Sequence, residues 1–296
     1  MLQPLVSVCI PVYNAEVYVA DALESALSQT WKRLEIIVVN DGSTDDTATV
    51  LNGYAHHPNV TIIDQENQGA AAARNRAYAE STGDLIKFFD GDDLLSPSFV
   101  ERQVERIGGS TAHIASSEWA RFYDDPEEAT FSPEPVWEDM NPVDWFITSW
   151  NDGDRMMQPA IWLIPRPLLD AAGAWDERLS LIDDFEFGVR LLMASDGVRF
   201  TPGARLYYRS GLDDSLSQRT SRPAVESAFL SLMLGTQHLL DRENSARTRR
   251  VAANILQDFV YSYYPYHDDL RARAQNRIQE LGGSDLEPSG PPGFEM

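Results

Sequence analysis

The stretch LIKFFDGDDLL, residues 85–95, places three carboxylates directly after a run of apolar and aromatic side chains: Asp90, Asp92 and Asp93. The apolar run predicts a buried strand, so the acids follow a strand end. A desolvated carboxylate costs several kcal/mol unless a cation or a hydrogen-bond donor pairs with it. These acids therefore either lie in water on a loop or surround a cation.

A second acidic pair, Asp183 and Asp184, begins the stretch DDFEFGVRLLMAS (183–195), whose apolar spacing predicts an amphipathic helix. The dipole at a helix N-terminus stabilises negative charge, which alone would explain both acids. A carboxylate can also act as a general base that takes a proton from an attacking hydroxyl group. The spacing by itself does not separate these two explanations.

The elements that must position these acids alternate along the first hundred residues. The strands are predicted at 5–10, 34–39, 59–63 and 84–89, and the helices between them at 14–31 and 69–82. This βαβαβαβ order predicts a mostly parallel sheet with right-handed crossovers. Ligands of such sheets bind at the carboxyl ends of the strands, where the polar sequences PVYN, NDGSTDD and DGDD lie here.

The remaining chain has a less regular pattern. Residues 112–124 predict one long strand or a pair of strands, and residues 158–165 predict another strand. From Pro223 to about Leu281 the apolar spacing is helical throughout. The Pro/Gly-rich end predicts a disordered tail.

Composition restricts the function further. The formal net charge of −22 would repel nucleic acid and anionic lipid, so no nucleic-acid partner is expected. No 18-residue apolar run is present, and the first apolar stretch predicts a strand rather than a signal peptide. The single cysteine, Cys9, excludes a disulfide within the chain and suits a reducing cytosol. We therefore expect a cytoplasmic protein.

Five blocks of the sequence, in order, resemble the inverting family 2 glycosyltransferases. The blocks are VSVCIPVYNAEVYVADALESALSQTW, EIIVVNDGSTDDT, NQGAAAARNRA, GDLIKFFDGDD and GAWDERLSLIDDFEFGVRL. The resemblance covers roughly residues 4 to 210 and implies an α/β fold of the GT-A type: a Rossmann-like, mostly parallel mixed sheet flanked by helices. We expect this domain at residues 1–215, with a donor-binding half at about 1–110 and an acceptor half at about 111–215. A helical extension at 216–282 and the tail at 283–296 would follow.

The resemblance implies roles for the residues of the first four blocks. It assigns the nucleotide of the donor to Pro11, Tyr13, Asp41, Arg74 and Asp90. Within this set, Asp41 would accept the ring N–H of a uracil-like base and Tyr13 would lie on the base. Asp92 would bind Mn²⁺ or Mg²⁺ directly, with Asp90 beside the ribose and the metal. Asp93 is an alternative ligand that the sequence does not separate from Asp92.

The fifth block implies the catalytic base. Displacement with inversion needs one carboxylate to take the proton of the acceptor hydroxyl, and no covalent intermediate. The family usually has Glu-Asp at this position, with the Asp as the base. This chain has Asp183-Asp184, so Asp184 corresponds to the base, and the shortened Asp183 departs from the family pattern.

We therefore expect an inverting, metal-dependent transfer of a sugar from a nucleotide-diphosphate donor, a UDP-sugar by the resemblance, to a hydroxyl of a glycan or lipid-linked acceptor. Such transfer builds cell-surface polysaccharides or glycoconjugates. The basic cluster ARTRR (246–250) is either a solvated helix face or a peripheral contact of the C-terminal helices with the inner face of the membrane. Two alternatives are an inactive glycan- or nucleotide-binding scaffold and a nucleotidyltransferase. The latter would need a Gly-rich, basic phosphate loop, which PVYNAEVY does not supply.

Overall fold

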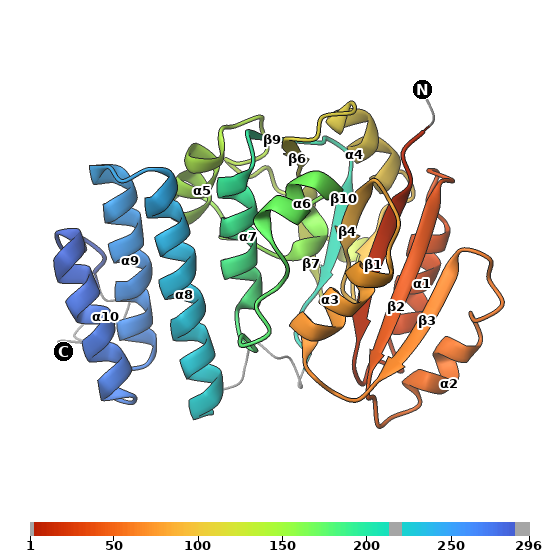
Figure 1. The fold of residues 1–296 in the computed structure, drawn as a ribbon, viewed down its shortest axis with the longest axis horizontal. Helices are drawn as coiled ribbons and strands as arrows, with labels where there is room; N and C mark the ends of the chain where they lie inside the picture. Colours follow the sequence, from red (N-terminus) through yellow and green to blue (C-terminus); the bar gives the residue numbers. More distant parts are fainter. Residues whose placement is uncertain (1–2, 213–220, 288–296) are drawn as a thin grey trace.

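The structure, a computed structural model, describes residues 3–212 and 221–287. Its central sheet has the strand order β3-β2-β1-β4-β8 (Figure 1). The strands are β1 (Val6–Val12), β2 (Leu34–Asp41), β3 (Val60–Gln65), β4 (Leu85–Phe88) and β8 (Ile164–Pro165). Strands β1 to β4 are parallel, and β8 pairs with β4 in the antiparallel direction. The α/β fold predicted from the sequence is confirmed.

The order of the strands reverses at β1, because the chain runs outward to β2 and β3 and then returns to β4 on the other side. Helices α1 (Val19–Leu27), α2 (Thr47–Asn52) and α3 (Ala70–Glu80) form the connections. In sheets of this kind, the crevice for a ligand opens at the carboxyl ends of the strands on either side of such a reversal. The polar turns that follow β1 and β4 are therefore neighbours at this edge.

Two smaller sheets accompany the central one. Strands β5 (Leu94–Leu95), β10 (Arg205–Arg209) and β7 (Glu118–Phe122) form one, and β6 (His113–Ala115) pairs with β9 (Gly197–Arg199) in the other. The segment 112–124 is thus a pair of short strands that belong to two different sheets. The prediction of a strand over 158–165 is wrong for its first half. Pro159 begins the 3₁₀ helix η2 (Pro159–Ile161), capped by the side chain of Gln158, and the chain is extended only from Trp162, through a bridge between Leu163 and Ala115, to β8.

The remaining helices follow β5 along the chain. They are α4 (Phe99–Ile107), the 3₁₀ turn η1 (Pro126–Glu128), α5 (Pro142–Asn151), α6 (Arg166–Ala172), α7 (Asp183–Ala194), α8 (Arg222–Arg242), α9 (Ala246–Ser262) and α10 (Asp268–Leu281). In Figure 1, α7, α8, α9 and α10 follow one another side by side, away from the β3 edge of the sheet. The predicted boundary at 215/216 and residues 288–296 of the predicted tail lie outside the described residues. The first residues of that tail, 283–287, are described, and Asp285 bonds to Arg250 and Asn254 of α9.

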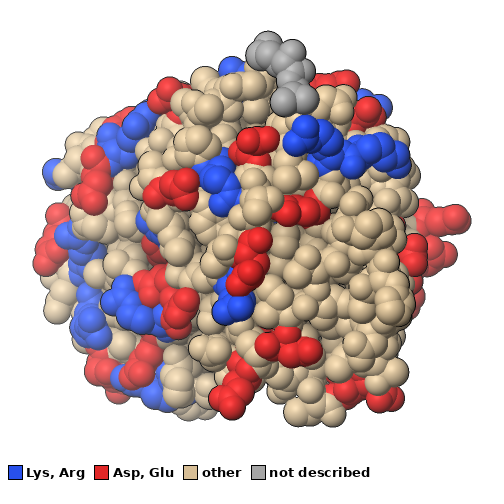
Figure 2. Space-filling model, turned by 45° about the vertical axis from the view of Figure 1, so that its right-hand side comes forward, with Lys and Arg blue, Asp and Glu red and all other residues tan. Residues whose placement is uncertain are grey.

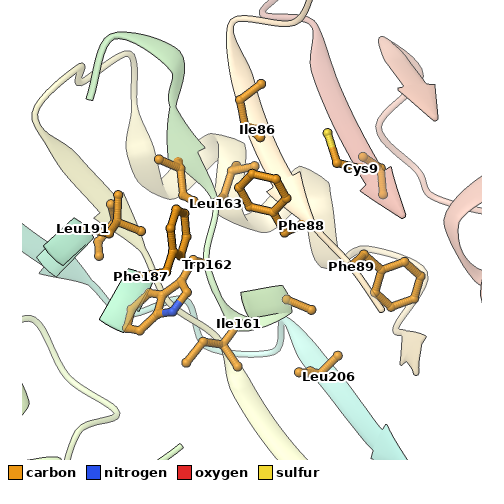
Figure 3. Close-up of a cluster of buried hydrophobic side chains, with 14 of the residues drawn as sticks. Cys9, Ile86, Phe88, Phe89, Ile161, Trp162, Leu163, Phe187, Leu191 and Leu206 are labelled. Carbon is orange, nitrogen blue, oxygen red and sulfur yellow. The ribbon is translucent and has the colours of Figure 1, made fainter. Parts of the chain in front are cut away.

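An apolar cluster joins the sheet to α7. Phe88 of β4 and Phe187 of α7 lie edge to face, with ring centroids 5.6 Å apart. Figure 3 shows both rings among the neighbouring apolar side chains Ile86, Leu163 and Leu191. Buried aromatic rings contribute large apolar areas and fix the relative position of the elements that carry them. The cluster therefore sets the distance between the acids that follow β4 and those that begin α7.

On the face in Figure 2, basic and acidic side chains are interspersed over the left side, and one group of basic side chains lies at the upper right. Within the cluster at 246–250, Arg247 is paired with Glu243 and Asp144, and Arg250 with Asp285. Among the described residues, no helix combines the length and the apolar character needed to cross a membrane.

Candidate active site

One arginine connects the two acidic clusters. Arg74, on α3, donates from Nη2 to Oδ1 of Asp90 over 2.8 Å and from Nη1 to Oδ2 of Asp183 over 2.9 Å. Its side chain is only 8% exposed, whereas those of Asp90 and Asp183 are 25% and 17% exposed. The strand-end acids and the helix-start acids therefore belong to one site, although about ninety residues separate them in the sequence.

Trp175 holds this arginine in place. The Arg74 guanidinium lies over the Trp175 ring, with Cζ 4.4 Å from its centroid. The indole in turn stacks on Phe187 of α7, with centroids 3.9 Å apart and ring planes 9° from parallel. Asn75, the neighbour of Arg74 on α3, bonds to both the backbone N–H and the C=O of Trp175. Stacking and hydrogen bonds together orient the guanidinium between its two carboxylates.

Among the three acids that follow β4, Asp93 is held by hydrogen bonds to other parts of the protein. It is fully buried, accepts a 2.9 Å hydrogen bond from the Arg209 backbone N–H, and accepts a 2.5 Å hydrogen bond from Nε2 of Gln158. Burial, followed by the negative charges of Asp92 and Asp90, raises the pKa of Asp93 well above its usual value. With both oxygens bonded to protein, Asp93 fastens the turn to β10.

Asp92 differs from Asp93 in keeping part of its surface exposed. Its backbone C=O accepts a 2.8 Å hydrogen bond from Nε of Arg209, whose guanidinium lies over the rings of Tyr18 and Phe122. Burial and the nearby charge of Asp90 raise the pKa of Asp92 to about 6. A cation beside Asp92 would oppose this shift and favour the ionised carboxylate, and Asp92 keeps some exposed surface through which a cation could approach.

Gly91, between Asp90 and Asp92, has no room for a larger side chain. A Cβ atom at Gly91 would lie 3.2 Å from Cγ2 of Val12 and 3.5 Å from the carbonyl oxygen of Pro11. The turn therefore packs directly on the end of β1, next to the exposed ring of Tyr13. Pro11 and Tyr13 thus lie at the same edge of the sheet as the acids.

Asp184 is the second residue of α7 and lies two positions after Ile182, whose backbone has a left-handed conformation. Its Oδ1 accepts a 2.9 Å hydrogen bond from the Phe185 backbone N–H. Burial, followed by the charge of Asp183, raises the pKa of Asp184 to about 7, although Arg74 acts in the opposite direction. A carboxylate with this pKa can exchange a proton with a hydroxyl group near neutral pH.

Asp41 ends β2 and is 2% exposed. Its Oδ1 accepts hydrogen bonds from Nε2 of Gln65 and the backbone N–H of Gln68, and its Oδ2 from the N–H of Gly69. A carboxylate has about four acceptor positions, so one remains on Oδ2. Asp41 therefore already holds the loop that leads into α3, a structural role additional to the one predicted from the sequence.

Gly69 leaves room at the N-terminus of α3. Its φ of 94° and ψ of 162° are open to glycine and are rarely adopted by other residues. A Cβ atom there would meet no other atom within 4 Å, so the space beside the backbone is open. The site therefore has an approachable helix N-terminus next to Asp41.

The sequence analysis missed three residues of the site: Gln158, Arg209 and Trp175. Nε2 of Gln158 bonds to Asp93 and, over 3.4 Å, to Oδ2 of Asp90, because η2 turns the chain where a strand was predicted. Arg209 ends an aromatic strand, which resembles many surface arginines. Trp175 lies within the fifth family-like block, and its position there was the one signal that could have identified it.

Comparisons with known proteins identify the family of this chain. The family model described as "Glycosyl transferase family 2" matches residues 7–169. A Bacillus subtilis (strain 168) protein named "Putative glycosyltransferase EpsH" is 30% identical over 240 residues, which cover 77% of this chain and 67% of that protein. The Escherichia coli chondroitin synthase is 46% identical over 99 residues, which are 33% of this chain and 14% of that enzyme.

Solved structures share the fold over almost the whole chain. The structure of S. aureus TarS residues 1–349 in complex with UDP-GlcNAc has a TM-score of 0.74, with 18% identity, and the match covers 94% of this chain and 81% of that one. The chain spans about two thirds of EpsH and a much smaller part of chondroitin synthase. On the family match and the shared fold, the chain belongs to glycosyl transferase family 2 and is a glycosyltransferase with the GT-A fold.

Proposed function

We propose that the protein is an inverting, metal-dependent transferase that moves a sugar from a UDP-sugar to a hydroxyl group of a glycan or lipid-linked acceptor. The observation that carries this proposal is Arg74, which bonds to Asp90 on the donor side and to Asp183 on the acceptor side. One site with two acidic clusters suits a reaction that binds a diphosphate at one end and removes a proton at the other. The TarS structure with UDP-GlcNAc supports a UDP-sugar as the donor.

Asp92 is the residue proposed to bind Mn²⁺ or Mg²⁺. Its raised pKa and partial exposure fit a cation ligand, whereas Asp93 already bonds to protein through both oxygens. Among the described residues, no group of three or more His, Cys, Asp or Glu side chains could hold a metal by itself. A cation here would therefore take most of its ligands from the donor diphosphate and water. When bound, it would offset the negative charge that develops on the diphosphate.

The chain's own residues would carry the rest of the reaction. The acceptor oxygen attacks the anomeric carbon while the bond from that carbon to the diphosphate oxygen breaks, and UDP leaves with the bonding electrons. Asp184 takes the hydroxyl proton, since its Oδ1 is bonded to Phe185 and its Oδ2 can face the acceptor. The negative charge of Asp183, which is paired with Arg74, raises the pKa of Asp184 and so makes Asp184 a stronger base.

Asp41, Pro11 and Tyr13 are proposed to bind the uridine. The remaining acceptor position of Asp41 could take the ring N–H of the base, and the exposed ring of Tyr13 could stack on it. A lipid-linked acceptor would bring the C-terminal helices near a membrane. Because Arg247 and Arg250 are already paired with acids, this contact would depend more on the acceptor than on a basic patch.

A panel of nucleotide sugars tests the proposal. UDP-glucose, UDP-galactose, UDP-GlcNAc and the GDP- and ADP-glucose counterparts are incubated with the protein and Mn²⁺, and release of the free nucleotide is measured. We expect release from one or more UDP-sugars and its loss when EDTA removes the metal. UDP binding without release from any of the sugars, even with simple glycan acceptors added, would instead favour an inactive nucleotide-binding scaffold.

A further inference from the structure

The residue before the acidic pair has an unfavourable backbone conformation. Ile182 has φ 48° and ψ 36°, the left-handed region, where the branched side chain of isoleucine is crowded. It occupies the N-cap of α7, yet its side chain cannot accept a hydrogen bond from the first turn. Such a conformation persists only where the surroundings hold it in place. Whatever holds Ile182 therefore also sets the direction of Asp183 and Asp184.

Ser231 of α8 holds this turn. Its hydroxyl donates to the C=O of Ile182 over 2.6 Å and accepts from the N–H of Glu186 over 3.3 Å. In an uninterrupted helix these two groups would form the first hydrogen bond of α7. The hydroxyl thus bridges them and acts as a cap supplied from another helix. Ser231 is fully buried, so water cannot easily replace it.

Ser227, one turn earlier on α8, holds the preceding residues. Its hydroxyl accepts from the backbone N–H groups of Ser180 (2.7 Å) and Leu181 (3.0 Å), and it donates to the C=O of Leu181 over 3.3 Å. A serine hydroxyl has one donor and two acceptor positions, so Ser227 is fully used. The segment 180–182 is therefore bonded to α8 through both of these serines.

Gly235, one further turn along the same face, lets the two helices approach. A Cβ atom at this position would lie 2.4 Å from Cε1 and 2.8 Å from Cδ1 of the Phe185 ring. The next turn places Nε2 of His238 3.0 Å from Oε1 of Glu186. Ser227, Ser231, Gly235 and His238 thus lie along one side of α8, facing the first turns of α7, and we name these four residues the α8 docking face.

We propose that the α8 docking face is a positioning element for the catalytic acids, with Ser231 as its central residue. The inference rests on the proposed role of Asp184 as the base. It gives a function to a helix that lies outside the region matched by the family model, residues 7–169. Ser231 is fully buried, so its role would be an indirect one. It acts through the backbone of Ile182 and Glu186, which fixes where the carboxylate of Asp184 lies.

Hydrogen exchange of the full-length chain tests the positioning directly and requires no donor. The variant Ser231→Ala is compared with Thr236→Val, which removes another buried hydroxyl of α8. The Thr236 hydroxyl bonds only within its own helix, to the C=O groups of Leu232 and Met233. We expect Ser231→Ala to speed amide exchange in residues 180–187 by about tenfold or more. Thr236→Val should leave this segment as in the wild type. Equal exchange in both variants would overturn the inference.

Turnover then shows whether the position matters for the chemistry. On the UDP-sugar that the panel identifies, Ser231→Ala should lower kcat about 10- to 100-fold, as expected for a displaced catalytic group. Its affinity for UDP in the presence of Mn²⁺ should change less than twofold. Thr236→Val should keep both values. Faster exchange with unchanged kcat would also overturn the inference, because the serine would then hold the backbone without guiding the base.

Two further variants separate the possible failures. Asp184→Asn is measured in the same assay: if it keeps turnover, the proposed role of Asp184 as the base is wrong, whatever the serine variants do. If Asp184→Asn is inactive but Ser231→Ala matches Thr236→Val in exchange and kcat, only the positioning role fails. The added methyl group of Gly235→Ala would clash with the Phe185 ring, so this variant should also have a lower kcat than the wild type. A fully active Gly235→Ala variant would contradict the inference.

Discussion

The two acidic clusters are held in different ways. Asp90, Asp92 and Asp93 follow a central strand, and their turn packs on the neighbouring strand and on β10. Asp183 and Asp184 begin a helix after a strained residue, and serines of a helix some fifty residues later in the chain hold that turn. The acids after β4 are thus positioned by the sheets, whereas the acids that begin α7 depend on α8. We expect substitutions outside the site to displace Asp183 and Asp184 more than the acids after β4.

Arg74 is the point where the two regions meet. A single guanidinium balances one carboxylate from each cluster, so neither side is electrostatically independent of the other. The pKa of Asp184 responds to both Asp183 and Asp90, which are the two partners of Arg74. Substituting one side chain at a time, and measuring turnover, UDP affinity and stability for each variant, therefore tests how far the two clusters differ.

The largest effect should follow the substitution Asp184→Asn. The amide is nearly isosteric but cannot accept the proton, and loss of a positioned base typically costs about 10² to 10⁴ in rate. We expect kcat for UDP release to fall by this amount, while calorimetry gives an unchanged affinity for UDP. Near wild-type turnover would show that the base lies elsewhere.

The next effect concerns Arg74 and the stability of the fold. Arg74→Gln leaves Asp90 and Asp183 largely buried without their common partner, and breaking a buried ion pair costs about 3 kcal/mol. Denaturant unfolding should show this loss in the free energy of unfolding. The matched control is Arg76→Gln on the same helix, whose side chain is 52% exposed and paired with Glu80. It should change stability by less than about 1 kcal/mol. Equal losses in the two variants would contradict the prediction, because the buried pairs of Arg74 would then stabilise the fold no more than the exposed pair of Arg76.

A smaller effect is expected for base recognition by Asp41. A hydrogen bond to a charged group contributes about 1.5 kcal/mol or more, which is roughly tenfold in affinity. Asp41→Ala should therefore weaken UDP about tenfold more than it weakens ADP, as measured by calorimetry. Because Asp41 also holds the loop before α3, some loss for both nucleotides is expected. An equal loss for UDP and ADP would leave Asp41 with the structural role alone.

The smallest effect is a shift along the pH axis. Asp184 must be ionised to accept a proton, so its pKa of about 7 predicts that turnover rises as the pH increases through neutrality. The negative charge of Asp183 contributes to that raised pKa. Asp183→Asn removes the charge, so the midpoint of the rise should move to lower pH in a kcat–pH profile. A midpoint that stays in place or moves upward would contradict the assigned role of Asp183.

Much of the fold could be predicted because local patterns determine it. The short β-branched runs became β1 to β4, and the acid-initiated amphipathic stretch became α7. The strand predicted over residues 158–165 was wrong in part because an apolar, β-branched composition is equally compatible with a 3₁₀ turn. Pro159 and the Gln158 cap favour that turn. Periodicity alone cannot decide such short apolar runs.

The site could be predicted only in part. The acids could be predicted because charged side chains seldom follow a buried strand or begin an amphipathic helix without a partner or a function. Their contacts were not predicted: Arg74 was assigned to the donor nucleotide, but not as a link between two regions about a hundred residues apart, and Ser231 is one of many serines in helical segments. Contacts of this kind depend on how helices pack, which the pattern of one helix does not reveal. Asp41 illustrates the same limit, since its hydrogen bonds to Gln65 and Gly69 follow from the loop conformation.

The central claim is that donor binding belongs to the strand-end acids and proton transfer to the helix-start acids. Calorimetric titration of UDP, with and without Mn²⁺, into the wild type, Asp92→Asn and Asp184→Asn tests it most directly. We predict that UDP binds the wild type and Asp184→Asn equally in Mn²⁺, and that omission of the metal or Asp92→Asn weakens binding by about tenfold or more. UDP binding that is independent of metal and unchanged in Asp92→Asn would contradict the claim.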